Sequence, residues 1–170
     1  MMTLYEATRD LHHACEQHPV GQRMAAGAIT AQEWADWLAA FRAIHVAIDP
    51  HNPAYMARVA LLDADLALLP APRPGRAAHD LAASLTTPES VSAASYVLHG
   101  AHRRGGRVLV KIMGKAGLPT AHVFYDLPGA AEEFVKAHRV RSDLAGEARR
   151  VFGGLLRVMD ELDSQLSVSG

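Results

Sequence analysis

A histidine and a carboxylate lie one helical turn apart near the beginning of the chain, at His12 and Glu16. The surrounding segment is expected to be helical, and at about 100° per residue His12 lies on the flank of its apolar stripe. His13 lies on the opposite, solvated side. This geometry favours His12 as an inward-facing imidazole with a carboxylate in reach. The alternative is a boundary histidine that merely packs against the core.

A second stretch places histidines and three glycines inside the longest predicted helix, over residues Tyr96–Leu109. The helix is expected to begin after Thr87-Pro88 and to end at Gly117-Leu118-Pro119. Each internal glycine costs about 1 kcal/mol relative to alanine, so three of them need a compensating reason. A flat or bulky group lying against the backbone, where a Cβ would collide, is one reason. Close packing of two helices is the other.

Composition limits the possible classes of protein. The 170 residues are 49% hydrophobic and 21% charged, with a net charge of −1, so neither nucleic acid nor an anionic membrane is indicated as a partner. The single cysteine, Cys15, allows no internal disulfide. The sequence shows neither a signal peptide nor an apolar run of about 20 residues, so we expect a cytoplasmic protein.

The ten histidines are unusual, but their spacing does not predict a metal cage built from protein ligands alone. No pair has the spacing of a metalloprotease helix, and a Glu-x-x-His motif of the di-iron type is missing.

Helical spacing recurs throughout the chain, and β-branched runs are scarce, so we predict an all-α protein. Capping boxes at Thr3–Glu6 and Thr30–Glu33 mark two helix starts. Helices are expected over about 3–17, 19–26, 31–49, 53–69, 77–85, 88–117, 129–142 and 145–166.

Three of these segments together carry a resemblance. They are the N-terminal run Glu6-Ala7-Thr8-Arg9-Asp10-Leu11-His12-His13-Ala14-Cys15-Glu16, the long helix with Tyr96 and Gly105-Gly106-Arg107-Val108-Leu109, and the basic run Phe134-Val135-Lys136-Ala137-His138-Arg139-Val140-Arg141. Their order and spacing resemble the heme oxygenase family. The likeness is strongest to its small bacterial members, some of which accompany bacteriophytochromes, and it covers nearly the whole chain.

The resemblance implies a single all-α domain over residues 1–170, with heme held between an N-terminal proximal helix and a kinked, glycine-rich distal helix. It implies that His12 is the axial ligand of the heme iron and that Glu16 hydrogen-bonds its far nitrogen. It assigns the distal catalytic positions to Gly100, Ala101, His102 and Gly105. It assigns further heme contacts to Arg9, Tyr96, Gly106, Lys136, Arg139 and Arg141, of which the last three would meet the propionates.

The reaction implied by the resemblance is the oxidative opening of heme to biliverdin, carbon monoxide and iron. Heme is then both cofactor and substrate, with dioxygen as the co-substrate. Electrons would come from a ferredoxin or a reductase, because the chain shows no flavin or nicotinamide site. Neither nucleic acid nor a membrane is expected as a partner.

The distal segment departs from the family pattern Gly-x-x-x-Gly-Gly, because four residues separate Gly100 from Gly105. Aligned without a gap, Ala101 takes the first glycine position and His102 the position where many members have aspartate. With one inserted residue, Gly100 keeps its role and the helix must bulge. Both alignments stay open at the level of sequence.

Two other functions remain. A heme-binding protein that stores, senses or delivers heme without opening it is favoured by the extra distal residue and by His102, which could become a second iron ligand. Apart from this alternative, Tyr5 lies where some members of the family have a propionate-binding lysine and His45 where some have tyrosine, so the resemblance implies less about the other residues around heme. A thiaminase-like or di-iron enzyme is disfavoured, since Cys15 lies on an apolar stripe and the carboxylate–histidine spacing is missing.

Overall fold

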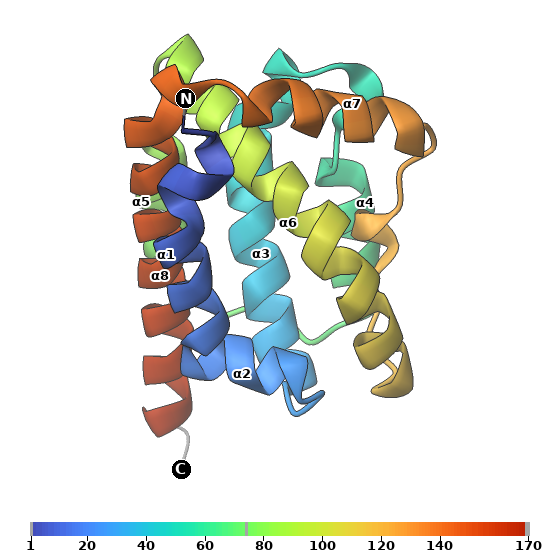
Figure 1. Cartoon of the computed structure of the whole chain (residues 1–170). Helices are drawn as coiled ribbons and strands as arrows, with labels where there is room; N and C mark the ends of the chain where they lie inside the picture. Colours follow the sequence, from blue (N-terminus) through green and yellow to red (C-terminus); the bar gives the residue numbers. More distant parts are fainter. Residues whose placement is uncertain (1, 74, 169–170) are drawn as a thin grey trace.

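The structure is a computed structural model that describes residues 2–73 and 75–168. Within those ranges the chain forms α-helices and short 3-10 turns and no β-strand, as predicted. Helix α8 packs against both α1 and α3, and in Figure 1 α7 crosses one end of these helices and α2 lies at the other. None of the helices in the described ranges combines the length and apolarity needed to cross a bilayer.

Local capping sets the beginning of the first helices. In α1 (Leu4–Gln17) the Glu6 amide donates to Thr3 Oγ1 at 3.2 Å, and Glu6 Oε2 accepts from the Thr3 amide at 2.7 Å. The same reciprocal box joins Thr30 and Glu33 at the start of α3 (Ala31–Ile48). Between them, α2 (Pro19–Ala25) is closed at Gly27, whose φ of +66° suits a residue without a Cβ.

The prediction of one helix over residues 53–69 is only partly correct. The segment opens with a 3-10 turn, Ala54–Met56, and α4 spans Val59–Leu66. A residue outside α4 determines where the helix begins, because Asp49 Oδ2 accepts hydrogen bonds from the backbone amides of Arg58 at 2.7 Å and Val59 at 3.0 Å. A carboxylate nine residues earlier in the chain replaces the local cap that the sequence lacks.

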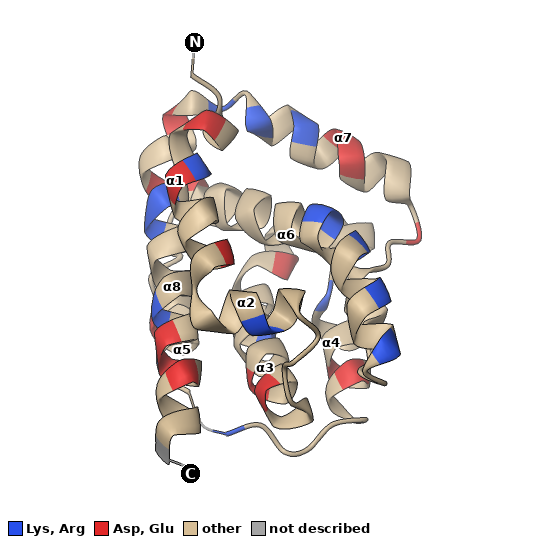
Figure 2. Cartoon of the chain, turned by 60° about the horizontal axis from the view of Figure 1, so that its bottom comes forward, with Lys and Arg blue, Asp and Glu red and all other residues tan. Residues whose placement is uncertain are grey.

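The long helix, α6 (Pro88–Lys115), is α-helical along its whole length, so no π-bulge accommodates an inserted residue. A Thr87 cap begins the helix, and Gly117, with a φ of +71°, follows its end. The ribbon of α6 changes direction part of the way along in two views (Figures 1 and 2). The Gly105–Gly106 pair is the feature of this helix that permits such a bend.

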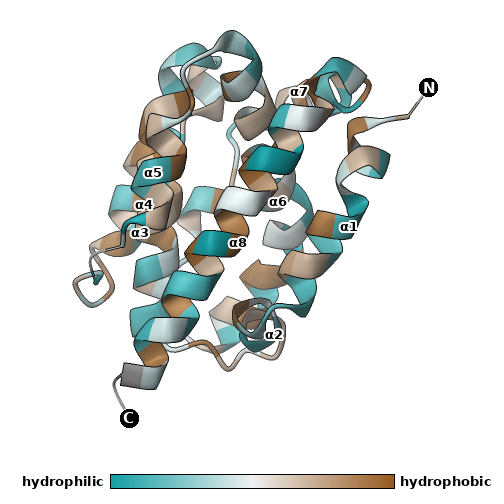
Figure 3. Ribbon diagram, turned by 90° about the vertical axis from the view of Figure 1, so that its left-hand side faces the viewer, coloured by the Kyte–Doolittle hydropathy of each residue, from teal (hydrophilic) through white to brown (hydrophobic). Residues whose placement is uncertain are grey.

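Three further helices complete the described part of the fold. They are α5 (Ala77–Ala83), α7 (Pro128–Arg139) and α8 (Ala145–Val168). Helix α8 packs against α1, α5 and α6, and in Figure 3 hydrophilic and hydrophobic residues alternate around it. The largest fully buried side chains come mainly from α3, α4, α6 and their neighbours: Trp34, Leu4, Leu38, Ile44, Ile48, Met56, Leu62, Leu81, Leu98, Met113, Leu144 and His45.

Candidate functional site

His12 and Glu16 interact as their spacing predicts. The Nδ1 atom of His12 lies 3.5 Å from Glu16 Oε1, and 44% of the His12 side chain is exposed. The edge of the His12 ring packs against Phe152 of α8. His13 is more exposed, at 69%, with its Nδ1 3.8 Å from the other Glu16 oxygen. With Nδ1 beside the carboxylate, Nε2 is the His12 nitrogen that is available to a ligand.

Tyr5, one turn before Arg9 on α1, connects three helices. The guanidinium of Arg104 on α6 lies 5.2 Å from the centre of the Tyr5 ring, and that of Arg139 on α7 lies 5.0 Å from it. Tyr96 belongs to the same group: burial raises the pKa of its hydroxyl, and the charges of Arg139 and Arg104 oppose that rise. The predicted residues Tyr96 and Arg139 therefore come together, with Arg104 as a further cation that was not predicted from the sequence.

The other predicted basic residues do not join this group. Lys136 is 72% exposed and lies 3.9 Å from Glu133 on its own helix. Arg141 forms an ion pair with Asp143, at 2.6 Å. Basic residues nevertheless follow one another along α7 and the second half of α6 (Figure 2).

Three glycines in the middle of α6, at positions 100, 105 and 106, have different surroundings. A Cβ on Gly106 would lie 3.0 Å from the nearest side-chain carbon of Val123, so close packing explains this glycine. Apart from its neighbours in the chain and the adjacent backbone of α6, a Cβ on Gly100 or Gly105 would have no heavy atom of the described residues within 4 Å. Ala101 and Gly105 are exposed, as is Val108, one turn further on. Packing within the protein therefore does not account for Gly100 or Gly105. Ala101, Gly105 and Val108 form an exposed apolar strip along α6.

His102 points into the core instead of toward this strip. It is 3% exposed, and its Nε2 lies 2.8 Å from Nε2 of His45 on α3. His99 and His122 are also buried, and their rings lie 5.9 Å and 5.4 Å from that of His102, centre to centre. A bond from His102 to an iron at the open face would require its ring to leave the contact with His45.

Carboxylates orient two of these imidazoles. His45 Nδ1 lies 2.8 Å from Asp49 Oδ1, and His122 Nδ1 lies 2.6 Å from Asp65 Oδ2. Hydrogen bonds from the imidazoles and backbone amides keep the pKa of Asp49 and of Asp65 below the usual value for a carboxyl. Burial lowers the pKa of His45, and it lowers the pKa of His99 and His102 well below 6.5. The rings of His45, His99 and His102 are therefore neutral, and the carboxylates of Asp49 and Asp65 are anionic.

Arg58 lies between these buried histidines and the loop after α6. Its guanidinium is 4.0 Å from the centre of the Tyr125 ring and donates to backbone carbonyls, among them those of Tyr55 at 3.0 Å and His122 at 3.3 Å. The Tyr125 hydroxyl in turn contacts His99 Nδ1. Arg58, Asp49 and Tyr125 had no local signature, because each acts through partners distant in sequence.

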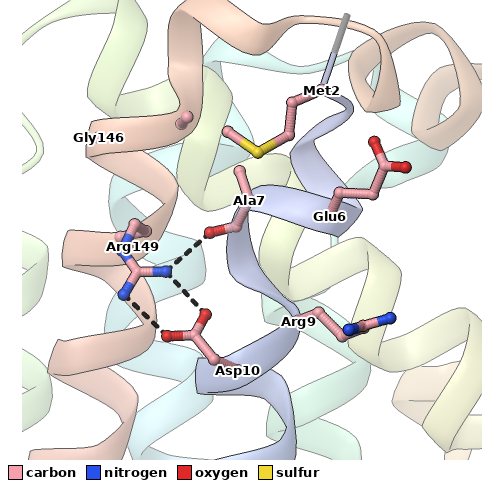
Figure 4. Close-up of a pocket in the computed structure, with 8 residues that line it drawn as sticks. Met2, Glu6, Ala7, Arg9, Asp10, Gly146 and Arg149 are labelled. Atoms are coloured by element: carbon pink, nitrogen blue, oxygen red, sulfur yellow. Dashed lines mark hydrogen bonds and ion pairs between the residues drawn. The ribbon is translucent and has the colours of Figure 1, made fainter.

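A surface hollow lies on another side of α1, between α1 and α8 (Figure 4). Arg149 Nη1 donates there to the Ala7 carbonyl at 2.8 Å and to Asp10 at 2.7 Å, so its charge is already paired. Arg9 lines the rim, but its side chain points away from Arg149 in Figure 4. This hollow is separate from the face that carries His12.

Comparison with known proteins shows what fold these elements form. No family model matches the chain, and no curated protein matches its sequence. Among solved structures, the chain is similar to heme oxygenase-1 from the cyanobacterium Synechocystis, which was solved in complex with heme. The TM-score is 0.79 with 18% sequence identity, over 98% of this chain and 93% of that one. The chain therefore has the all-α fold of a heme oxygenase, as its motifs predict.

Proposed function

We propose that this protein binds heme between α1 and α6 and opens its ring oxidatively, giving biliverdin, carbon monoxide and iron. The observation that carries the proposal is the placement of His12 on α1 in a fold that matches a heme-bound heme oxygenase along 98% of the chain. Heme would be the substrate as well as the cofactor, and a ferredoxin or reductase would supply electrons.

The residues of this face fit heme. His12 offers an imidazole whose Nδ1 is already beside Glu16, the arrangement that fixes a tautomer and strengthens a ligand. Gly100 and Gly105 leave the backbone of α6 accessible without a protein packing reason. Arg104 and Arg139 provide cations for the propionates at one edge.

The protein's own residues would bind and orient the reactants. His12 would hold the iron from the α1 side, and the small side chains of α6 would leave room for dioxygen on the other. His102, neutral and turned toward His45, would place no charge and no second ligand at the open face. The bound heme supplies the redox chemistry and activates dioxygen.

A hemin titration followed by turnover with ascorbate tests this proposal. We expect a one-to-one complex whose Soret band decays as a bilin spectrum appears. His12→Ala should lose the native ferric spectrum, and added imidazole should restore part of it. His13→Ala is the matched control and should behave as the unmodified protein.

Two results would contradict the proposal in different ways. A tight, low-spin bis-histidine complex that does not decay would identify a heme carrier or sensor. An unchanged spectrum and unchanged turnover in His12→Ala would show that another residue is the axial ligand.

A further inference from the structure

A buried group of potential metal ligands lies in the core, formed by His45, Asp49 and His99. One ligand atom from each of these residues lies within 4.8 Å of the others. His45 and His99 are fully buried, and the Asp49 side chain is 9% exposed. These residues come from α3, the turn that follows it and α6, and none of them is a predicted ligand of heme iron.

One nitrogen of this group lacks a partner. His99 Nε2 is buried and makes no hydrogen bond with any of the described residues. A buried polar atom left without a partner costs about 1–3 kcal/mol, so a native core rarely keeps one without a reason. A ligand that accepts the lone pair of His99 Nε2 would remove this cost.

Hydrogen bonds from neighbouring residues hold Asp49 and His99 in orientations that suit metal binding. Asp49 Oδ2 accepts the amides of Arg58 and Val59, which fixes its carboxylate. The Tyr125 hydroxyl contacts Nδ1 of His99, which leaves Nε2 as the coordinating atom. Such partners set the tautomer and the direction of a metal-binding imidazole.

His45 can serve in the same way. Its Nδ1 faces Asp49 Oδ1 at 2.8 Å, and its Nε2 faces His102 Nε2 at 2.8 Å. An ion bound between His45 Nδ1 and Asp49 would replace the hydrogen that they share. His45 Nε2–H could then donate to His102, so His45 would remain neutral.

We propose that His45, Asp49 and His99 bind one divalent transition-metal ion in the core, separate from heme. Two imidazoles and a carboxylate suit zinc, cobalt, nickel or ferrous iron, whereas calcium and magnesium prefer oxygen ligands. Bonds of about 2.0–2.1 Å in a tetrahedral site put ligand atoms about 3.3 Å apart. The side chains therefore need to close by at most about 1.5 Å from their 4.8 Å limit.

The local charge permits such an ion. Arg58 is a cation whose charge acts on His45 and His99, and its guanidinium is held by backbone carbonyls and the Tyr125 ring. The Asp49 carboxylate offsets this charge, and its side chain remains 9% exposed to solvent. Because Arg58 stays close, we expect an affinity below that of a site with only anionic neighbours.

Titration of the heme-free, full-length protein with Co²⁺ at neutral pH tests the proposal. We expect one Co²⁺ per chain with visible d–d absorption, displaced by Zn²⁺. X-ray absorption of the zinc form should show two imidazoles. Asp49→Asn and His99→Gln should each weaken binding more than about 100-fold, since even the loss of a group that only orients a ligand costs about 10–100-fold. The exposed neighbour His51 provides the matched control, His51→Gln, with unchanged affinity.

Circular dichroism of each variant checks that it folds. If His99→Gln does not fold, Tyr125→Phe removes only the Nδ1 partner and should still weaken binding about 10–100-fold. His12→Ala should bind Co²⁺ normally, which separates this site from the proposed heme site. Absence of saturable Co²⁺ binding, or equal weakening in His51→Gln, would overturn the proposal and assign the space beside His99 to water.

Discussion

His45 and His102 lie with their Nε2 atoms 2.8 Å apart, although α3 and α6 contribute them from positions 57 residues apart. Only one of the two nitrogens can carry the hydrogen between them. Asp49, as an ionised carboxylate, accepts from His45 Nδ1–H, so without a bound metal His45 Nε2 is the acceptor and His102 the donor. The pair is therefore two neutral rings in fixed tautomers.

This neutrality predicts how stability depends on pH. Burial lowers the pKa of His45, His99 and His102 in the folded state, while in the unfolded chain each titrates near its usual value of about 6.5. As pH falls below about 6.5, these three histidines become protonated in the unfolded chain but stay neutral in the folded protein. The free energy of unfolding should then fall by about 1.4 kcal/mol per pH unit for each histidine that stays neutral.

Urea denaturation of metal-free protein between about pH 7 and pH 5 measures this slope. His102→Gln should reduce it, whereas His13→Gln, on the solvated side of α1, should leave it unchanged. A free energy of unfolding that stays constant over this range would show that the buried histidines are protonated in the folded state.

The glycines of α6 should respond to substitution in opposite ways. Gly105→Ala has open space for its Cβ and should stabilise the heme-free protein by about 1 kcal/mol. Gly105→Leu should fold but weaken hemin binding, because its side chain would occupy the proposed heme face. Gly106→Leu would collide with Val123 and should destabilise the fold by about 1–3 kcal/mol. Thermal melts and hemin titrations of the three variants give the comparison, and unimpaired hemin binding in Gly105→Leu would argue against this face.

The basic residues near the proposed heme edge should differ in importance. Arg139→Ala and Arg104→Ala remove guanidinium groups that flank Tyr5, and each should weaken hemin binding about 10-fold or more. Arg141→Ala should have little effect, because Arg141 is already paired with Asp143. Fluorescence quenching during hemin titration measures the three affinities. Equal losses in all three variants would indicate a general effect of charge instead of specific contacts.

Arg58 should be important for stability. Arg58→Met would leave several buried or partly buried carbonyls without their donor, and we expect a loss of about 3 kcal/mol in the free energy of unfolding. Arg107→Met, at a residue that is 75% exposed, is the control and should change it by less than about 0.5 kcal/mol. Chemical denaturation measures the free energy of unfolding of both variants. Equal values for Arg58→Met and Arg107→Met would show that Arg58 is not important for stability.

Cys15 should behave as an unreactive thiol. Burial raises its pKa to about 11, so near pH 8 its thiolate fraction is about 100-fold below that of a thiol with a pKa of 9. Alkylation by iodoacetamide should therefore be much slower in the folded protein than in urea. Fast alkylation of the folded protein would instead revive the thiaminase-like alternative, which needs a reactive thiolate.

Sequence was sufficient wherever the determining interactions are local. The capping boxes at Thr3 and Thr30, the helix periods and the turn at Gly117 join residues a few positions apart, so the all-α class and most helix ends were predicted correctly. The His12–Glu16 pair is local in the same sense, and its spacing was enough to predict its contact.

The tertiary structure decided what depends on partners distant in the chain. The start of α4 depends on Asp49, and the different surroundings of Gly105 and Gly106 depend on where Val123 packs. His45 and His99 meet only because α3 and α6 cross in the core. No sequence spacing encodes such a contact, since it arises from apolar burial that brings separate helices together and then selects which polar groups must pair.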